Sequence, residues 1–159
     1  MQMESNVKRI SCQGKNILDS RALIHYLDVS DVRHTSREES MRILAVEDEP
    51  EYLEMLKDVM KSIGHTITIA ENGSDALSLL DREKIDVVLS DVRMPTMNGI
   101  EFHEKLRAKP AYRNTPFIFL TGVDDLTEVK SICKADCDLL LQKPFPVDKL
   151  IRMFTGQLK

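Results

Sequence analysis

From Met41 to the C-terminus, short apolar segments alternate with amphipathic segments, and this pattern constrains the fold more than any other feature. The segment Pro50–Ile63 has apolar residues at three- and four-residue spacing, which is typical of a helix with one buried face. A proline near its start and Gly64 just after its end fit helix boundaries. The segment Ile85–Leu89 ends in a continuous apolar run, which indicates a strand buried on both faces.

The same reasoning assigns the rest of this segment. The expected strands are Arg42–Val46, Thr66–Ala70, Ile85–Leu89, Phe117–Leu120 and Leu139–Leu141, and the expected helices are Pro50–Ile63, Ser74–Leu80, Gly99–Arg107, Asp125–Cys133 and Val147–Leu158. Five strands that alternate with five helices through short connections predict an α/β fold, with a parallel sheet covered by helices on both faces.

Residues 1–40 differ from the remainder and form an expected N-terminal extension to a domain spanning 41–159. They contain six basic and six acidic side chains and little sustained periodicity. A short helix over Ser20–Val29 would place Ala22, Leu23, Tyr26 and Leu27 on one face, but a segment of that length needs a docking surface to persist. A flexible, passive tail and a segment that docks on the domain both remain open.

Composition excludes several classes of function. With 22 Lys and Arg against 26 Asp and Glu, the chain has a net charge of −4 and no basic excess for direct binding of nucleic acid. No apolar run approaches the roughly 20 residues needed to cross a bilayer. Because the N-terminus also lacks the apolar core of a secretory signal, we expect a cytoplasmic protein without membrane contact.

Polar side chains follow the expected strands where ligands of open α/β sheets bind, at the carboxyl ends. Glu47 and Asp48 follow the first strand, and Asp91, Thr121 and Lys143 follow the third, fourth and fifth strands. Three converging carboxylates repel one another unless a cation lies among them, and oxygen ligands of this kind suit Mg²⁺. Together with a lysine and a hydroxyl, they fit phosphoryl transfer to an aspartate that forms an acyl phosphate.

Each of these residues also has a simpler interpretation. Asp91 alone is a common type of helix N-cap or turn residue, and Asp48, just before Pro50, could be an ordinary loop residue. Lys143 alone is most often a solvated surface charge. Only their joint placement at one edge of the predicted sheet favours a phosphoryl site.

Four motifs in order give a resemblance to a known family. They are Glu47-Asp48-Glu49-Pro50 after the first strand, Asp91-Val-Arg-Met-Pro-Thr-Met-Asn-Gly99, Thr121-Gly122 and Lys143-Pro-Phe145. The segment from Met41 to Lys159 resembles the receiver domain of bacterial two-component response regulators. That resemblance implies a flavodoxin-like, doubly wound sheet with strand order 2-1-3-4-5 and the site at the switch between strands one and three.

The resemblance also implies a role for each site residue. Asp91 would be the phosphoacceptor, and Thr121 and Lys143 would contact the phosphoryl group. Glu47, Asp48, Asp91 and the main-chain carbonyl of Arg93 would hold Mg²⁺. The Lys143–Pro144 bond would be cis.

Further implications concern activity and partners. Such a domain catalyses only its own aspartate phosphorylation and dephosphorylation, and its phosphoryl donor is a sensor histidine kinase or a histidine phosphotransferase. Because no output domain follows residue 158, we expect a stand-alone regulator that contacts an unknown downstream protein. Dimerisation through the last helices is left open.

The chain departs from the family pattern at Leu140, where members commonly have an aromatic residue that moves during switching. Arg93 and Val123 occupy positions that flank the water attacking the acyl phosphate in the family. Since valine cannot hydrogen-bond this water and Arg93 could shield the phosphoryl group, we expect a long-lived phosphoryl adduct.

Two other functions compete with this interpretation. A phosphatase of the haloacid dehalogenase type would also use an aspartate nucleophile and Mg²⁺, but it needs a second aspartate where this chain has Arg93. A receiver-like module that docks without phosphorylation is the other alternative, and Leu140 is the residue that favours it.

Overall fold

A parallel β-sheet between two layers of helices forms the body of this computed structural model, which describes residues 40–133, 135 and 137–155. The strands are β1 (Arg42–Val46), β2 (Thr66–Ala70), β3 (Val87–Asp91), β4 (Phe117–Thr121) and β5 (Asp138–Gln142). The helices are α2 (Pro50–Ser62), α3 (Gly73–Leu80), α4 (Gly99–Ala108), α5 (Leu126–Ile132) and α6 (Val147–Thr155), with a short 3₁₀ helix, η2 (Pro110–Tyr112). The predicted extension, with its helix over Ser20–Val29, lies outside the described residues apart from Ser40.

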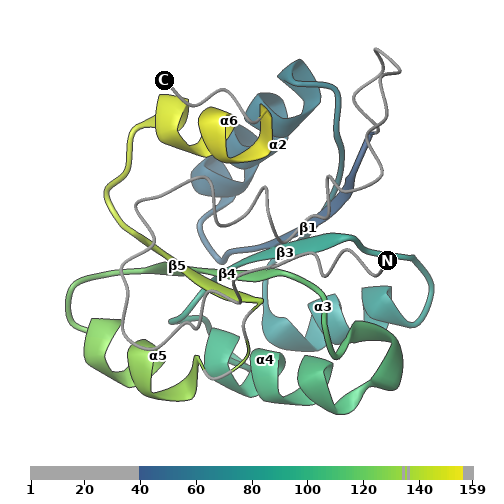
Figure 1. The fold of residues 1–159 in the computed structure, drawn as a ribbon, viewed down its shortest axis with the longest axis vertical. Helices are drawn as coiled ribbons and strands as arrows, with labels where there is room; N and C mark the ends of the chain where they lie inside the picture. Colours follow the sequence, from purple (N-terminus) through teal and green to yellow (C-terminus); the bar gives the residue numbers. More distant parts are fainter. Residues whose placement is uncertain (1–39, 134, 136, 156–159) are drawn as a thin grey trace, which may run out of the picture.

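The strand order is β2-β1-β3-β4-β5, and every pairing is parallel. Helices α2 and α6 cover one face of the sheet, and α3, α4 and α5 cover the other (Figure 1). The predicted flavodoxin-like sheet and its order 2-1-3-4-5 are therefore confirmed. The order reverses between β1 and β3, so the loops after these two strands diverge to opposite faces of the sheet.

The apolar side chains of the central strands form the core, as the predicted burial on both faces requires. In β1, β3 and β4 almost every residue is buried, whereas the edge strand β2 is only partly buried. Helix α2 contributes Leu53, Leu56 and Met60, the apolar positions of its predicted face. Burial of such side chains is the main contribution to folding free energy.

The predicted boundaries agree with the structure within about one residue for most elements. The predicted end of the last helix at Leu158 lies outside the described residues. The strand β3 differs from its prediction at both ends. Its apolar run predicts a strand over Ile85–Leu89, but the strand spans Val87–Asp91. Hydrogen bonding continues past the apolar run because Ser90 and Asp91 pair with Phe119 and Leu120 of β4. The prediction was also wrong in omitting η2. Asp91, which the sequence places after the strand, is therefore held by the sheet.

The loop after β3 is fixed by close backbone contacts. A Cβ atom on Gly99 would lie 2.1 Å from the main-chain oxygen of Asp91, so only glycine fits there. The amide of Gly99 donates to the Val92 carbonyl at 2.9 Å, and Asn98 and Glu101 form a capping box that begins α4. These contacts hold the main chain around Asp91 in one conformation.

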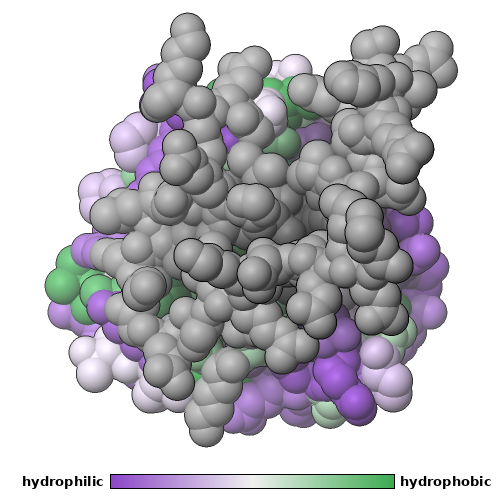
Figure 2. Space-filling view, viewed as in Figure 1, coloured by the Kyte–Doolittle hydropathy of each residue, from purple (hydrophilic) through white to green (hydrophobic). Residues whose placement is uncertain are grey.

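The outer surface of the helices is polar, as expected for helices with one buried face. Figure 2 shows hydrophilic residues over the outer side of the layer that contains α3 and α4. Within the described part of the chain, every helix is too short or too polar to span a bilayer.

Candidate functional site

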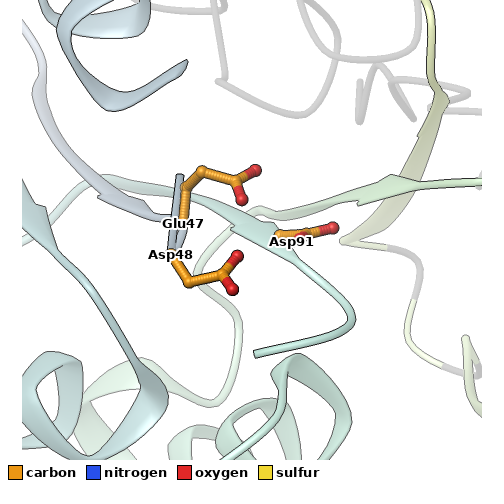
Figure 3. A group of neighbouring side chains, drawn as sticks. All are labelled: Glu47, Asp48 and Asp91. Atoms are coloured by element: carbon orange, nitrogen blue, oxygen red, sulfur yellow. The ribbon is translucent and has the colours of Figure 1, made fainter. Parts of the chain in front are cut away.

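The strand ends bring the three predicted carboxylates together. Glu47 and Asp48 directly follow β1, and Asp91 is the last residue of β3. One ligand oxygen from each residue lies within 4.8 Å of the others, and the three carboxyl groups point into one space beyond the strands (Figure 3). Glu47 is fully buried, Asp91 is half-buried and Asp48 is exposed. The cluster therefore opens to solvent on the side of Asp48.

Lys143 extends from the end of β5 into the same cluster. Its Nζ donates to Glu47 Oε2 at 2.7 Å and lies 3.5 Å from Asp91 Oδ1. The main-chain amide of Lys143 donates to the Thr121 carbonyl at 2.8 Å, which ties this loop to β4. The Lys143–Pro144 bond is cis, as the resemblance implied.

The electrostatics of the cluster follow from one cation facing several carboxylates. Burial raises the pKa of Glu47, the Lys143 hydrogen bond lowers it, and the charge of Asp91 raises it again, giving a value of about 7. Burial lowers the pKa of Lys143, but its hydrogen bond and charge interaction with Glu47 outweigh burial and raise the pKa overall. Negative charge thus exceeds positive charge at this edge of the sheet.

Thr121 lies beside the cluster without a direct link to the carboxylates. It ends β4, is fully buried, and follows Leu120, which pairs with Asp91 across the sheet. Its hydroxyl donates to the carbonyl of Gly122 at 3.0 Å. The structure therefore brings Thr121 to the predicted edge of the sheet, with its hydroxyl bonded to the main chain.

The Arg93 side chain pairs with an aspartate that sequence reasoning assigned to a helix start. Arg93 Nε donates to Asp125 Oδ1 at 2.6 Å, and Asp125 is buried whereas the Arg93 side chain is 74% exposed. Asp125 precedes α5, but its side chain does not cap that helix. The pair borders a groove of about 430 Å³ that also includes Asp48, Asn98 and Glu128.

Two aromatic residues also border this site: Tyr52, which sequence reasoning missed, and Phe145, which it named only as part of a motif. Lys143 Nζ lies 4.4 Å from the centroid of the Tyr52 ring, and the Phe145 ring meets that ring at 88° with centroids 6.1 Å apart. Burial and the charges of Glu47 and Asp91 raise the pKa of Tyr52 above its usual range, so the phenol stays neutral. The one available signal was the position of Tyr52 in the first turn of α2, next to the acidic pair.

The donor set fits a hard divalent cation. Three carboxylates offer oxygen ligands from two adjacent strand ends, with open space for water on the solvent side. Burial is the main cause of the raised pKa of Glu47, and the charge of Asp91 adds to it; a cation bound among these carboxylates would favour their ionised forms. Mg²⁺ therefore suits the cluster, as the sequence predicts.

Residues 43–155 match the family model described as the response regulator receiver domain. The chain belongs to this family. The predicted class, a phosphoacceptor receiver of two-component signalling, is thereby confirmed at the level of the family. The family match does not support the alternative of a haloacid dehalogenase phosphatase. Receiver domains as a family are not conventional enzymes.

Relatives of this receiver domain include parts of larger proteins. It is 36% identical over 134 residues to the sensor histidine kinase RcsC of Salmonella typhi, covering 84% of this chain but only 14% of that kinase. It is 34% identical over 107 residues to a CheY homolog of Campylobacter jejuni, covering 66% of this chain and 82% of the homolog. The chain thus spans a small part of one relative and most of the other.

Solved receiver structures share the fold. The receiver domain of a signal transduction histidine kinase from Syntrophus aciditrophicus has a TM-score of 0.64 and 32% identity, over 76% of this chain and 94% of that domain. CheY4 of Vibrio cholerae has a TM-score of 0.64 and 28% identity, over 76% of this chain and all of that protein. The sheet and the helices described above are therefore those of a receiver domain.

Proposed function

We propose that this receiver domain accepts a phosphoryl group on Asp91 and signals through contact with another protein. The observation that supports this most is the placement of Lys143, which lies between the buried Glu47 and the half-buried Asp91. A lysine that is only a solvated surface charge would not be expected to contact two carboxylates, one of them buried. Beside it, Asp48 completes a group of oxygen ligands.

The proposed reaction is an in-line transfer from a phosphohistidine. An Asp91 carboxylate oxygen attacks phosphorus, the P–N bond of the donor breaks, and the imidazole nitrogen keeps that electron pair. Mg²⁺ held by Glu47, Asp48, Asp91 and the Arg93 carbonyl would neutralise charge on the phosphoryl oxygens. Lys143 would pair with one phosphoryl oxygen, and rotation of the Thr121 hydroxyl away from Gly122 would let it donate to another.

We infer that the chain catalyses only this step and the hydrolysis of the resulting acyl phosphate. The donor would be a sensor histidine kinase or a histidine phosphotransferase, since receiver domains generally interact with such proteins and with downstream effectors. The downstream partner would be recognised through protein contact. The cytoplasmic location and residues 1–40 as a separate extension stay predictions.

The test uses a small phosphodonor and intact mass. Purified protein incubated with Mg²⁺ and acetyl phosphate should gain one phosphoryl adduct, which Asp91→Asn and removal of Mg²⁺ should both abolish. Decay of the adduct after donor removal gives its lifetime, which we expect to be long because Val123 cannot hydrogen-bond the attacking water and Arg93 would shield the phosphoryl group. An adduct on the Asp91→Asn protein, or none on folded wild-type protein, would contradict the proposal.

One observation favours the phosphorylation-independent alternative. Leu140 is buried in β5 at a position where family members commonly have an aromatic residue that moves during switching. Absence of an adduct, together with unchanged partner binding by Asp91→Asn, would favour a docking module.

A further inference from the structure

We propose that Tyr52 is a positioning residue for phosphoryl transfer, whose ring holds the Lys143 ammonium beside Asp91. The inference rests on the proposed function of Asp91 and adds a residue outside the six site residues predicted from the sequence. The contact that suggests it is the 4.4 Å separation between Lys143 Nζ and the centre of the Tyr52 ring. An ammonium at this distance is attracted by the negative face of an aromatic ring.

The ring is itself held in place, which a positioning role requires. Tyr52 lies in the first turn of α2, which begins at Pro50, directly after the acidic pair and Glu49. The Phe145 ring meets the Tyr52 ring edge to face, and both residues pack against the hydrophobic core. Phe145 also follows Lys143 by two residues, so the same loop supplies the lysine and the support for the ring that faces it.

To stay beside Asp91, the Lys143 ammonium needs a contact with an uncharged group, because a charged partner would compete with the phosphoryl oxygens for the ammonium. Lys143 Nζ is 2.7 Å from Glu47 but 3.5 Å from Asp91, so its strongest contact is with a carboxylate other than the proposed phosphoacceptor. During transfer the ammonium must turn toward a phosphoryl oxygen on Asp91, and the Glu47 contact weakens. The neutral ring of Tyr52 attracts the ammonium in both positions, and therefore limits how far Lys143 can move into solvent.

This role differs from simple packing in what it demands of the side chain. Packing would require an apolar group of similar size, whereas a cation–π contact requires an aromatic face. Phenylalanine keeps the face and loses the hydroxyl, and leucine keeps apolar bulk and loses the face. Tyr52→Phe and Tyr52→Leu are thus matched variants at a half-buried position that should tolerate both.

The experiment measures the initial rate of adduct formation with Mg²⁺ and acetyl phosphate for wild-type, Tyr52→Phe, Tyr52→Leu, Lys143→Ala and Tyr52→Leu/Lys143→Ala proteins. We expect Tyr52→Phe to stay within about twofold of wild type and Tyr52→Leu to fall about fivefold, the size of a partly desolvated cation–π contact. In the Lys143→Ala background, Tyr52→Leu should cause no further loss, because its effect acts through the lysine.

A second readout needs neither metal nor phosphodonor. Reductive methylation of Lys143, followed by peptide mass spectrometry in metal-free buffer, should be faster in Tyr52→Leu than in wild type or Tyr52→Phe. Thermal melting checks that each variant is folded, and Tyr52→Met replaces Tyr52→Leu if that variant melts early.

The outcomes separate the two proposals. Wild-type protein without an adduct would overturn the function of Asp91 and this inference together. An adduct that forms equally fast in wild type and Tyr52→Leu, or an equal loss from Tyr52→Leu with and without Lys143, would overturn only the role of Tyr52.

Discussion

Two buried carboxylates lie at opposite ends of the sheet, and their surroundings explain why one belongs to a candidate site and the other to the scaffold. Glu47 follows the end of β1, whereas Asp138 begins β5. Both are essentially inaccessible to solvent, at 0% and 1% exposure. Each accepts a short hydrogen bond from a basic side chain, Glu47 from Lys143 at 2.7 Å and Asp138 from Arg107 at 2.6 Å.

The difference lies in the balance of charge around each group. Asp138 is also bonded to His103 at 2.8 Å, whose ring packs against Phe117 and Phe119. Burial raises the pKa of Asp138, but the hydrogen bonds and charges of His103 and Arg107 outweigh it and lower the pKa overall. Glu47 instead shares one lysine with Asp91, and its pKa is raised to about 7.

This comparison shows that burial alone does not identify a functional carboxylate. A buried acid whose partners satisfy its charge stabilises the fold, whereas a buried acid with too few cations is held in an unfavourable state that a ligand can relieve. The position in the sheet agrees, since ligands bind at the carboxyl ends of the strands and Asp138 lies at the amino end of β5.

The largest expected effect is on stability, from Asp138→Ala. Removing this carboxylate leaves the buried His103 and the partly buried Arg107 without their shared partner, which should lower the free energy of unfolding by about 3–5 kcal/mol. Denaturant unfolding measures the loss. The control is Asp86→Ala, because the Arg42–Asp86 pair is largely exposed and should contribute about 1 kcal/mol or less. Equal losses in the two variants would remove the distinction between a structural cluster and a surface pair.

Addition of Mg²⁺ should have the next largest effect, confined to the acidic cluster. A ligand that binds only the folded state at 100 times its Kd stabilises that state by about 2.7 kcal/mol. Thermal melting with and without Mg²⁺ should show this gain in wild type and in Asp86→Ala, but not in Asp48→Asn. A gain of the same size in Asp48→Asn would place the ion elsewhere.

The smallest expected effect is on the pH dependence of the free energy of unfolding, measured without divalent metal. The contributions of Glu47 and Asp138 to it should have opposite signs. Between about pH 4.5, the ordinary pKa of a glutamate, and pH 7, folded Glu47 keeps a proton that the unfolded chain has lost. Raising the pH through this window therefore lowers the free energy of unfolding of wild type relative to Glu47→Gln. One pKa unit corresponds to about 1.4 kcal/mol. Because Lys143 interacts with Glu47 and shares the titration, we expect a decrease of about 2 kcal/mol.

Asp138 should behave in the reverse sense. Its pKa is lowered in the folded state, so its contribution is present above the ordinary value of 3.8 and is lost as the pH falls below it. Among the described residues, His103 and Arg107 are ionisable groups that contact Asp138. Urea unfolding at a series of pH values measures the pH dependence at both carboxylates. A wild-type minus Glu47→Gln difference that does not change between pH 4.5 and 7 would contradict the assigned charge imbalance.

Much of the candidate site could be predicted because its residues follow strands in sequence. The apolar runs locate the strand ends within about two residues, and parallel strands necessarily bring those ends to one edge of the sheet. Glu47, Asp48, Asp91 and Lys143 therefore came together as predicted. The kind of ligand that these residues bind could also be predicted, because the residue types and their order along the chain define the set of ligand atoms.

Contacts between side chains on separate elements could not be predicted in the same way. The Arg93–Asp125 pair joins residues 32 apart in the chain, and His103 and Asp138 are 35 apart. Neither pair belongs to a periodic pattern, and each partner alone has an ordinary interpretation on a helix or in a loop. The contact of Tyr52 with Lys143 was missed for the same reason.

By itself, the sequence determined the alternation of strands and helices and the chemical groups at the strand ends, because these depend on local periodicity and order along the chain. The tertiary structure alone decided which of the buried acids is short of positive charge. That property depends on the distances from Glu47 and Asp138 to every neighbouring charge, and those distances exist only once the sheet and its helices have packed.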